Sequence, residues 1–288
     1  SDCRAATAER LGGEVPDTVR QHFDRTAPDG AGVRCAHITS TLDTPGTPRR
    51  GLARLALLRL GDGPVPLVVV NDVDGVPGTL RAVELAATLP PAMLETFSLI
   101  GMDRRGTGES GSVDCVPPET RATLLDHDPT TTVDPLLDAA RVAGQQCAIS
   151  LEDSRTALDS WRTAGDLDEL REQLGVPRLN LLARGEGSTS VAHYTARYPD
   201  RVGRVVLDGV PDPSSELVTV LDGVAGSAEA TLDEFAADCA RRDCPLGDDA
   251  RTAVEDLIDR ARATPLRSGD DRTLGPTLVA RAVLTGLA

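Results

Sequence analysis

Apolar runs alternate with amphipathic stretches through the first two thirds of the chain. Five apolar runs predict β-strands, at residues 52–60, 65–71, 97–103, 179–183 and 204–210. Helical periodicity lies between them, at residues 79–90, at residues 164–176 and in the segment after Gly187. Strands that alternate with helices predict a mostly parallel, doubly wound sheet flanked by helices.

The pattern changes after the proline- and serine-rich segment 208–215. Residues 228–244 and 248–264 have the spacing of amphipathic helices, with no strand between them. We therefore expect a core over residues 1–212 and a helical cap over residues 213–288. Residues 126–140 show no period that can be interpreted, and a polar loop is expected there.

Charge and composition disfavour several classes of partner. The net charge of −15 and the pI near 4.7 would repel nucleic acids and anionic membrane surfaces. No apolar run approaches the roughly 20 residues that span a bilayer, so no membrane span is expected. The sequence contains no lysine, which excludes a lysine base or Schiff base. Only six residues are aromatic (one Trp, two Tyr and three Phe), which offers no platform for stacking bases or sugars.

The chain has six cysteines and no C-x-x-C pair, and its four histidines are scattered. This pattern supports neither a metal site nor any cofactor. The favoured disulfide pairing is sequential: Cys3 with Cys35, Cys115 with Cys147, and Cys239 with Cys244. Three disulfides would indicate an oxidising compartment and hence the mature part of a secreted or extracytoplasmic protein. The alternative is six unpaired thiols in a cytosolic protein.

Four stretches together resemble one known family. They are GMDRRGTGESGSVDC (101–115), with the pattern D-x-R-G-x-G-x-S before a cysteine, and the segments 164–182, 196–210 and 239–247. They resemble secreted actinobacterial α/β-hydrolases similar to tripeptidyl aminopeptidases and proline iminopeptidases, over most of residues 30–250. The resemblance implies an α/β-hydrolase-like fold with a helical cap. It also implies a serine nucleophile in a strand-turn-helix elbow, an oxyanion loop, and an Asp and a His after the cap.

The elbow departs from that pattern. Residues 183–187, Ala-Arg-Gly-Glu-Gly, align with G-x-S-x-G, so that Gly185 stands where the serine would be. Our interpretation is that glycine relaxes a turn that serine would strain. Ser188 and Ser190 follow on the predicted helix and are expected to point away from the turn. His193, on the same helix, is expected to be a packed or surface residue.

The oxyanion loop and the end of the chain depart as well. The loop-equivalent segment 71–79 keeps Asn71 but places Asp72 and Asp74 where the family has small uncharged residues. Carboxylates there would oppose a developing oxyanion, although aspartates are also common turn formers. No histidine follows His193, so the C-terminal part of the usual fold is expected to be missing.

These departures favour an exported pseudo-hydrolase, expected to be inactive in catalysis, with a binding or interaction role. The alternative is a serine hydrolase or aminopeptidase acting on short peptides or esters, in a truncated or nucleophile-knockout form. The expected partner is a peptide-like ligand with a free amino terminus, for which Asp72, Asp74 and Glu186 are suitable charges, or a protein chain that completes an open sheet edge. Asp103, Arg104 and Arg105 are expected to fix a loop, and Trp161 to pack.

Overall fold

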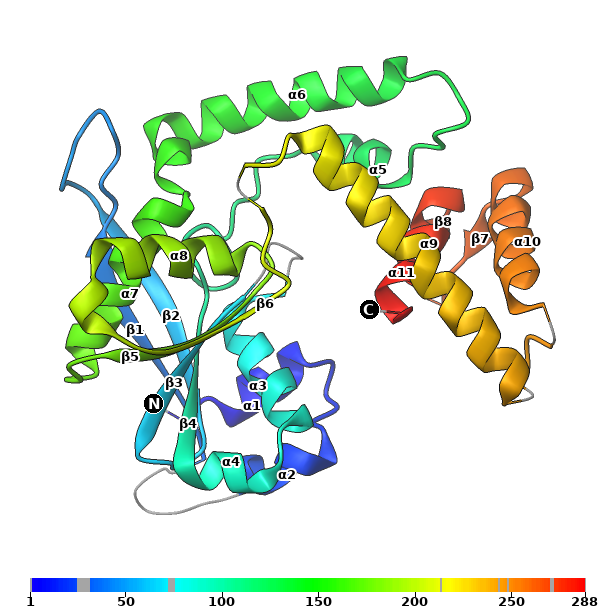
Figure 1. The fold of residues 1–288 in the computed structure, drawn as a ribbon. Coiled ribbons are helices and arrows are strands. Elements are labelled where there is room, and N and C mark those ends of the chain that lie inside the picture. The colour runs from blue at the N-terminus through cyan, green and yellow to red at the C-terminus, as the bar shows by residue number, and fades with distance from the viewer. Residues whose placement is uncertain are drawn as a thin grey trace. The chain divides into compact units, whose positions relative to one another are not determined.

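The computed structural model describes residues 2–24, 32–71, 76–212, 214–242, 244–247, 249–269 and 272–287. The chain forms two compact units (Figure 1), the first comprising Ser1–Asp114 and Asp153–Pro213, the second Cys115–Glu152 and Ser214–Ala288. The second unit therefore includes residues 115–152, which lie within the core range expected from the sequence.

A six-stranded mixed sheet forms the centre of the first unit. Its strands are β1 (Val33–Thr41), β2 (Leu52–Leu60), β3 (Val65–Val70), β4 (Phe97–Met102), β5 (Leu179–Arg184) and β6 (Val202–Asp208). The spatial order is β1-β2-β4-β3-β5-β6. The pairs β4–β3, β3–β5 and β5–β6 are parallel, whereas β1–β2 and β2–β4 are antiparallel. The five predicted strands are confirmed, and β1 is a sixth strand that the apolar pattern did not predict.

Helices cover both faces of this sheet (Figure 1). On one face, Leu167 and Leu170 of α7 (Ser160–Gln173) and Tyr194 of α8 (Gly187–Arg197) pack against buried residues of β5 and β3. On the other, Val19 of α2 (Asp17–Asp24) and Val83 of α3 (Gly78–Thr88) pack against β2, β3 and β4. Two short helices, α1 (Arg4–Arg10) and α4 (Pro91–Thr96), complete this layer, and the 3-10 segments are η1 (Glu152–Ala157) and η2 (Pro199–Arg201).

The second unit is mainly helical. Its elements are α5 (Pro118–Asp126), α6 (Asp134–Leu151), α9 (Leu217–Arg241), α10 (Ala250–Ala263), β7 (Leu266–Arg267), β8 (Thr273–Leu274) and α11 (Pro276–Leu287). Arg251 of α10 forms ion pairs with Glu229 and Asp233 of α9. The expected polar loop at 126–140 is wrong for its second half, because α6 begins at Asp134. Ala139 is the only buried residue described in α6, so the helix lacks the apolar stripe that reveals a helix in sequence.

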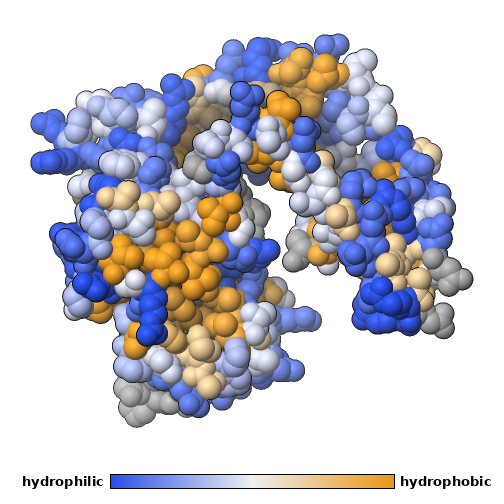
Figure 2. Space-filling model, in the orientation of Figure 1, coloured by the Kyte–Doolittle hydropathy of each residue, from blue (hydrophilic) through white to orange (hydrophobic). Residues whose placement is uncertain are grey.

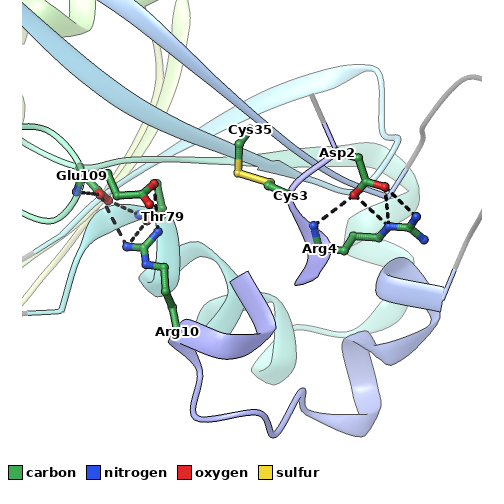
Figure 3. The surroundings of a disulfide bond; sticks show 8 residues. Asp2, Cys3, Arg4, Arg10, Cys35, Thr79 and Glu109 are labelled. Atoms are coloured by element: carbon green, nitrogen blue, oxygen red, sulfur yellow. Dashed lines mark hydrogen bonds and ion pairs between the residues drawn. A yellow bond between two sulfur atoms is a disulfide. The ribbon is translucent and has the colours of Figure 1, made fainter. Parts of the chain in front are cut away.

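All six cysteines form disulfides. They join Cys3 to Cys35, Cys115 to Cys147, and Cys239 to Cys244, which is the sequential pairing. The first ties the start of α1 to β1 (Figure 3). Three disulfides favour an extracytoplasmic protein. Among the helices that the structure describes, none is both long and apolar enough to cross a bilayer.

Tyr194 is expected to make the free energy of unfolding fall at alkaline pH. Its side chain is fully buried, and its hydroxyl donates a hydrogen bond to the Arg201 carbonyl (3.2 Å). Burial, followed by the nearby Asp168 carboxylate, raises the pKa of Tyr194 from 10.0 to about 12. In the folded state the phenol therefore stays neutral at a pH where the unfolded chain has already ionised.

We expect this contribution to be complete below pH 10 and to be lost as the pH rises to about 12. The loss amounts to about 2–3 kcal/mol of the free energy of unfolding. Urea unfolding at a series of pH values measures it. Tyr194→Phe should be less stable at neutral pH by about 1 kcal/mol, because it loses a hydrogen bond, but its stability should fall less between pH 10 and 12. An unchanged alkaline slope in this variant would contradict the assignment.

Candidate functional site

A tight turn joins β5 to α8 at the centre of the candidate site. β5 ends at Arg184 and α8 begins at Gly187, which leaves Gly185 and Glu186 in the turn. Gly185 has a φ of 53°, in the left-handed region that side chains disfavour. Its N–H donates to the Asp208 carbonyl (2.8 Å), and its carbonyl accepts from the Ser188 N–H (3.0 Å). The turn therefore has the strand-turn-helix form expected of an elbow, and its apex carries no side chain.

Two glycines allow the first turns of α8 and α3 to contact the backbone at the strand ends. A Cβ on Gly187 would lie 2.7 Å from the carbonyl oxygens of Val70 and Asn71. A Cβ on Gly78 would lie 2.0 Å from the Met102 carbonyl oxygen. Any larger residue at either position would push a helix away from the sheet. The first turns of α8 and α3 are thus held against the C-terminal ends of β3 and β4.

The serines of α8 are buried, and its histidine packs against Trp161. Ser188 and Ser190 are fully buried, and neither Oγ has a hydrogen-bond partner within the described part of the chain. His193 is half-buried, with its ring edge-on to Trp161 at 5.5 Å between centroids. Trp161 is 48% exposed, and it packs at the surface near the start of α7, where the Arg197 guanidinium covers its ring at 4.4 Å.

The oxyanion-loop equivalents are described only in part. Asn71 follows β3 and is buried, and its side-chain Nδ2 donates to the Val76 carbonyl (2.9 Å). This bond braces the two ends of the loop against each other. Asp72 and Asp74 lie outside the described residues.

The D-x-R-G-x-G-x-S motif folds into a braced loop after β4. The buried Asp103 carboxylate accepts from the Thr79 N–H (2.8 Å) and from the Glu109 N–H (2.9 Å). Arg10 of α1 lies 3.8 Å from this carboxylate and 3.3 Å from that of Glu109 (Figure 3). A Cβ on Gly108, whose φ is 50°, would lie 2.2 Å from Asp103 Oδ2. Asp103 therefore ties this loop to the start of α3.

Arg105 ties the same loop to three distant segments. Its guanidinium donates to both carboxylate oxygens of Asp166 in α7 (2.5 and 2.8 Å), and both side chains are buried. It also donates to the carbonyls of Thr41, Leu42 and Ala157. Burial raises the pKa of the Asp166 carboxyl, and the ion pair with Arg105 opposes that shift. The prediction that Asp103 and Arg105 fix a loop is confirmed.

A pocket of about 480 Å³ lies beside the turn. Its lining comes from the motif loop, the start of α7 and the turn itself: Arg104, Arg105, Gly106, Thr107, Leu158, Asp159, Ser160, Thr163 and Glu186. The Glu186 carboxylate lies within 3.4 Å of the Ser160 Oγ. Asp159 caps α7 by accepting from the Arg162 N–H (2.7 Å), so its carboxylate is already engaged. Glu186 thus contributes an acidic group to a pocket that adjoins Gly185. Sequence reasoning did not foresee the pairing with Ser160, which is 26 residues away.

Metal ligation finds no support in the geometry. Within the described ranges, no group of three or more His, Cys, Asp or Glu side chains is placed to hold a metal ion.

The positive φ of Gly185 predicts how a substitution there changes the free energy of unfolding. We expect Gly185→Ala to lower the free energy of unfolding by about 1 kcal/mol, because alanine is strained in the left-handed region. Gly165→Ala is the matched control, since Gly165 lies within α7 and a Cβ there would meet only the Arg197 guanidinium at 3.8 Å. That variant should be more stable by up to about 1 kcal/mol. Denaturant unfolding of both variants checks the opposite signs, and a Gly185→Ala variant as stable as the native protein, or more stable, would contradict the prediction.

Comparison with known proteins places this site in a family. The family model described as the alpha/beta hydrolase fold matches residues 74–284. The serine protease Hip1 of Mycobacterium tuberculosis is 28% identical over 263 residues, which cover 88% of this chain and 50% of that protein. The tripeptidyl aminopeptidase of Streptomyces lividans is 30% identical over 128 residues, or 43% of this chain and 24% of that protein.

Among solved structures, a proline iminopeptidase-related protein from Thermus thermophilus shares 21% identity, with a TM-score of 0.31 over 60% of this chain and 44% of that one. The chain spans half the length, or less, of these curated relatives. The family model covers well over half of the sequence, and its match includes the turn, the motif loop and the pocket. The chain therefore belongs to the α/β-hydrolase fold family.

Proposed function

We propose that this protein is an exported pseudo-hydrolase that binds a peptide-like ligand beside the β5–α8 turn and forms no acyl-enzyme there. The observation that carries the proposal is Gly185, which occupies the apex of the turn with a φ of 53°. Covalent acyl transfer requires a side-chain nucleophile at the apex of the elbow. Glycine offers only hydrogen at that point.

The other nucleophilic groups do not compensate for this loss. Ser188 and Ser190 are fully buried within α8. All six cysteines are in disulfides, so none supplies a thiolate. Lysine is absent from the sequence. The turn therefore adjoins a pocket that contains the Glu186 carboxylate, an arrangement that suits noncovalent binding.

The chemistry of the pocket supports a ligand with a cationic amino group. Glu186 presents its carboxylate next to the Ser160 hydroxyl, and Leu158 contributes an apolar wall. The net charge of −15 favours the approach of cations over anions. A peptide with a free amino terminus combines an ammonium group with apolar and amide surface. We include Asp72 and Asp74, which follow Asn71 closely in the sequence, among the acidic groups that would attract it.

The relatives favour a second candidate function. Those named as a serine protease and a tripeptidyl aminopeptidase suggest a serine hydrolase that acts on short peptides or esters. In that case the natural gene product would carry serine at position 185, and residues beyond Ala288 would supply the acid and the histidine. The two candidates differ in whether the native molecule can form a covalent acyl or phosphonyl adduct.

The covalent test separates the two candidates. We expect a fluorophosphonate probe to leave the protein unlabelled in intact-mass spectra. Tripeptidyl p-nitroanilides and short p-nitrophenyl esters should be turned over no faster than in buffer. A known serine hydrolase serves as the positive control for the probe. Stoichiometric labelling of the native protein, or turnover that the probe abolishes, would replace the first candidate with the second.

The ligand assignment is tested at Glu186. By calorimetry, a tripeptide with a free amino terminus should bind the native protein, and its N-acetylated form should bind more weakly. Glu186→Gln should weaken the free tripeptide about tenfold, the scale expected for one charge-assisted hydrogen bond. Glu119→Gln, at an exposed position of α5, is the control for a change of net charge. Equal losses in both variants, or none, would remove Glu186 from the proposed site.

A further inference from the structure

α1 contacts the motif loop (residues 103–110) through Arg10, the residue at which the helix ends (Figure 3). Its Nη2 donates a hydrogen bond to Thr79 Oγ1 (3.2 Å) and lies 3.8 Å from Asp103 Oδ2. Its Nη1 lies 3.3 Å from Glu109 Oε2. One guanidinium therefore joins α1 to the start of α3 and to two carboxylates of the loop that follows β4.

The charge on Arg10 compensates a carboxylate that is removed from water. The Asp103 side chain is fully buried, and it accepts hydrogen bonds from the N–H groups of Thr79 and Glu109. In the described part of the chain, Arg10 is the one cationic side chain that pairs with it. A buried carboxylate is tolerated only when it is paired and hydrogen-bonded. Loss of Arg10 would therefore leave a buried negative charge without its cation, at the base of the motif loop.

The segment between the two carboxylates forms one wall of the pocket beside the β5–α8 turn. Residues 104–107 line that pocket. Within the loop, the Gly106 N–H donates to the Ser110 carbonyl (3.2 Å), so the loop is closed on itself. A Cβ on Gly106 would lie 3.2 Å from both methyl carbons of Leu158, which lines the same pocket. Because the loop is compact and packs against this wall, a shift at either carboxylate would displace the lining of the pocket.

The position of α1 depends on few buried contacts. Thr7 is the one buried residue among those described in this helix, and Leu11, just after it, is only partly buried against the cluster that α2 and α3 form with the sheet. Figure 2 shows a further apolar area over β5 and β6, whose described residues do not belong to this cluster. The Cys3–Cys35 disulfide fixes the start of α1 to β1 (Figure 3). The disulfide therefore helps to set where Arg10, at the other end of the helix, meets the motif loop.

Given the proposed peptide-binding function, we propose that Arg10 is a positioning residue for the pocket and that the Cys3–Cys35 disulfide holds it in place. Arg10 is not among the residues that line the pocket. It acts through Asp103 and Glu109, which fix the loop that carries part of the lining. A binding site works when its walls are held to within about 0.5 Å of the productive geometry by the residues behind them. Loosening the loop should therefore weaken binding without removing any group that touches the ligand.

The first test measures ligand affinity. We expect Arg10→Gln to weaken binding of the tripeptide with a free amino terminus about fivefold by calorimetry, the scale of a coupling that acts through other residues. Arg20→Gln is the matched control, because Arg20 is an exposed arginine of α2 that pairs with Asp17, and its replacement removes the same charge. Arg10→Lys keeps a cation without the planar fork and should recover part of the affinity. Unchanged affinity in Arg10→Gln, or an equal loss in Arg20→Gln, would overturn the proposal.

A double-mutant cycle with Glu109 separates positioning from a general loss of stability. Glu109→Gln should weaken the same tripeptide by about twofold, because Arg10 then loses one of its two carboxylates. Added to Arg10→Gln, it should cause no further loss, because the contact that it removes is already absent. Fully additive losses would show that the two residues act independently of each other, which contradicts the proposed route through the loop.

Amide hydrogen exchange tests the role of Arg10 without any ligand. The N–H groups of Glu109 and Gly106, which are hydrogen-bonded within the loop, should exchange about tenfold faster in Arg10→Gln, whereas those of β3 and β4 should be unchanged. If the native protein does not bind the tripeptide but the loop responds in this way, the peptide-binding function fails and the positioning of the loop by Arg10 stands. An unchanged loop would overturn the role of Arg10 whatever the ligand experiment shows.

The disulfide is tested by the same exchange measurement. Cys3→Ser/Cys35→Ser should also accelerate exchange in residues 104–109, because the start of α1 is no longer fixed to β1. Cys239→Ser/Cys244→Ser, which removes a disulfide of the second unit, is the control and should leave that segment unchanged. Equal acceleration in both double variants, or none in the first, would overturn the part assigned to the Cys3–Cys35 disulfide.

Discussion

The buried ion pair between Arg105 and Asp166 is the constraint on which the first unit depends. Both side chains are almost completely removed from water, and a buried charge is tolerated only when paired and hydrogen-bonded. The planar guanidinium can reach the Asp166 carboxylate and three carbonyls at once, which an ammonium group could not do. The loop after β4 is thereby fixed to the end of β1, to η1 and to α7.

Glycine sets the second constraint, at the ends of the central strands. Gly187 and Gly78 allow α8 and α3 to start in backbone contact with the ends of β3 and β4. Gly185 adopts its positive φ without strain, where a serine would have to be held in place by its surroundings. The turn therefore has a strand-turn-helix shape with glycine at its apex. This shape depends on backbone packing and on the positive φ of Gly185.

The polar groups near the turn differ in their surroundings. Asp103, Arg105 and Asn71 use their hydrogen bonds on neighbouring backbone, which explains why a motif rich in charge supplies so little free chemistry. Glu186 differs, because its carboxylate lines a pocket beside a serine hydroxyl.

The sequence by itself determined the five apolar strands, the helices between them and the structural role of the 103–110 motif, because burial on a sheet face leaves a local pattern. It could not reveal β1, an edge strand in which polar residues face solvent, or α6, which has Ala139 as its only described buried residue. Nor could it show that β2 runs antiparallel to β4, that Trp161 lies at the surface, or that Glu186 meets Ser160. These features depend on which distant segments come into contact, and local periodicity records burial without recording the partner. Only the tertiary structure decided them.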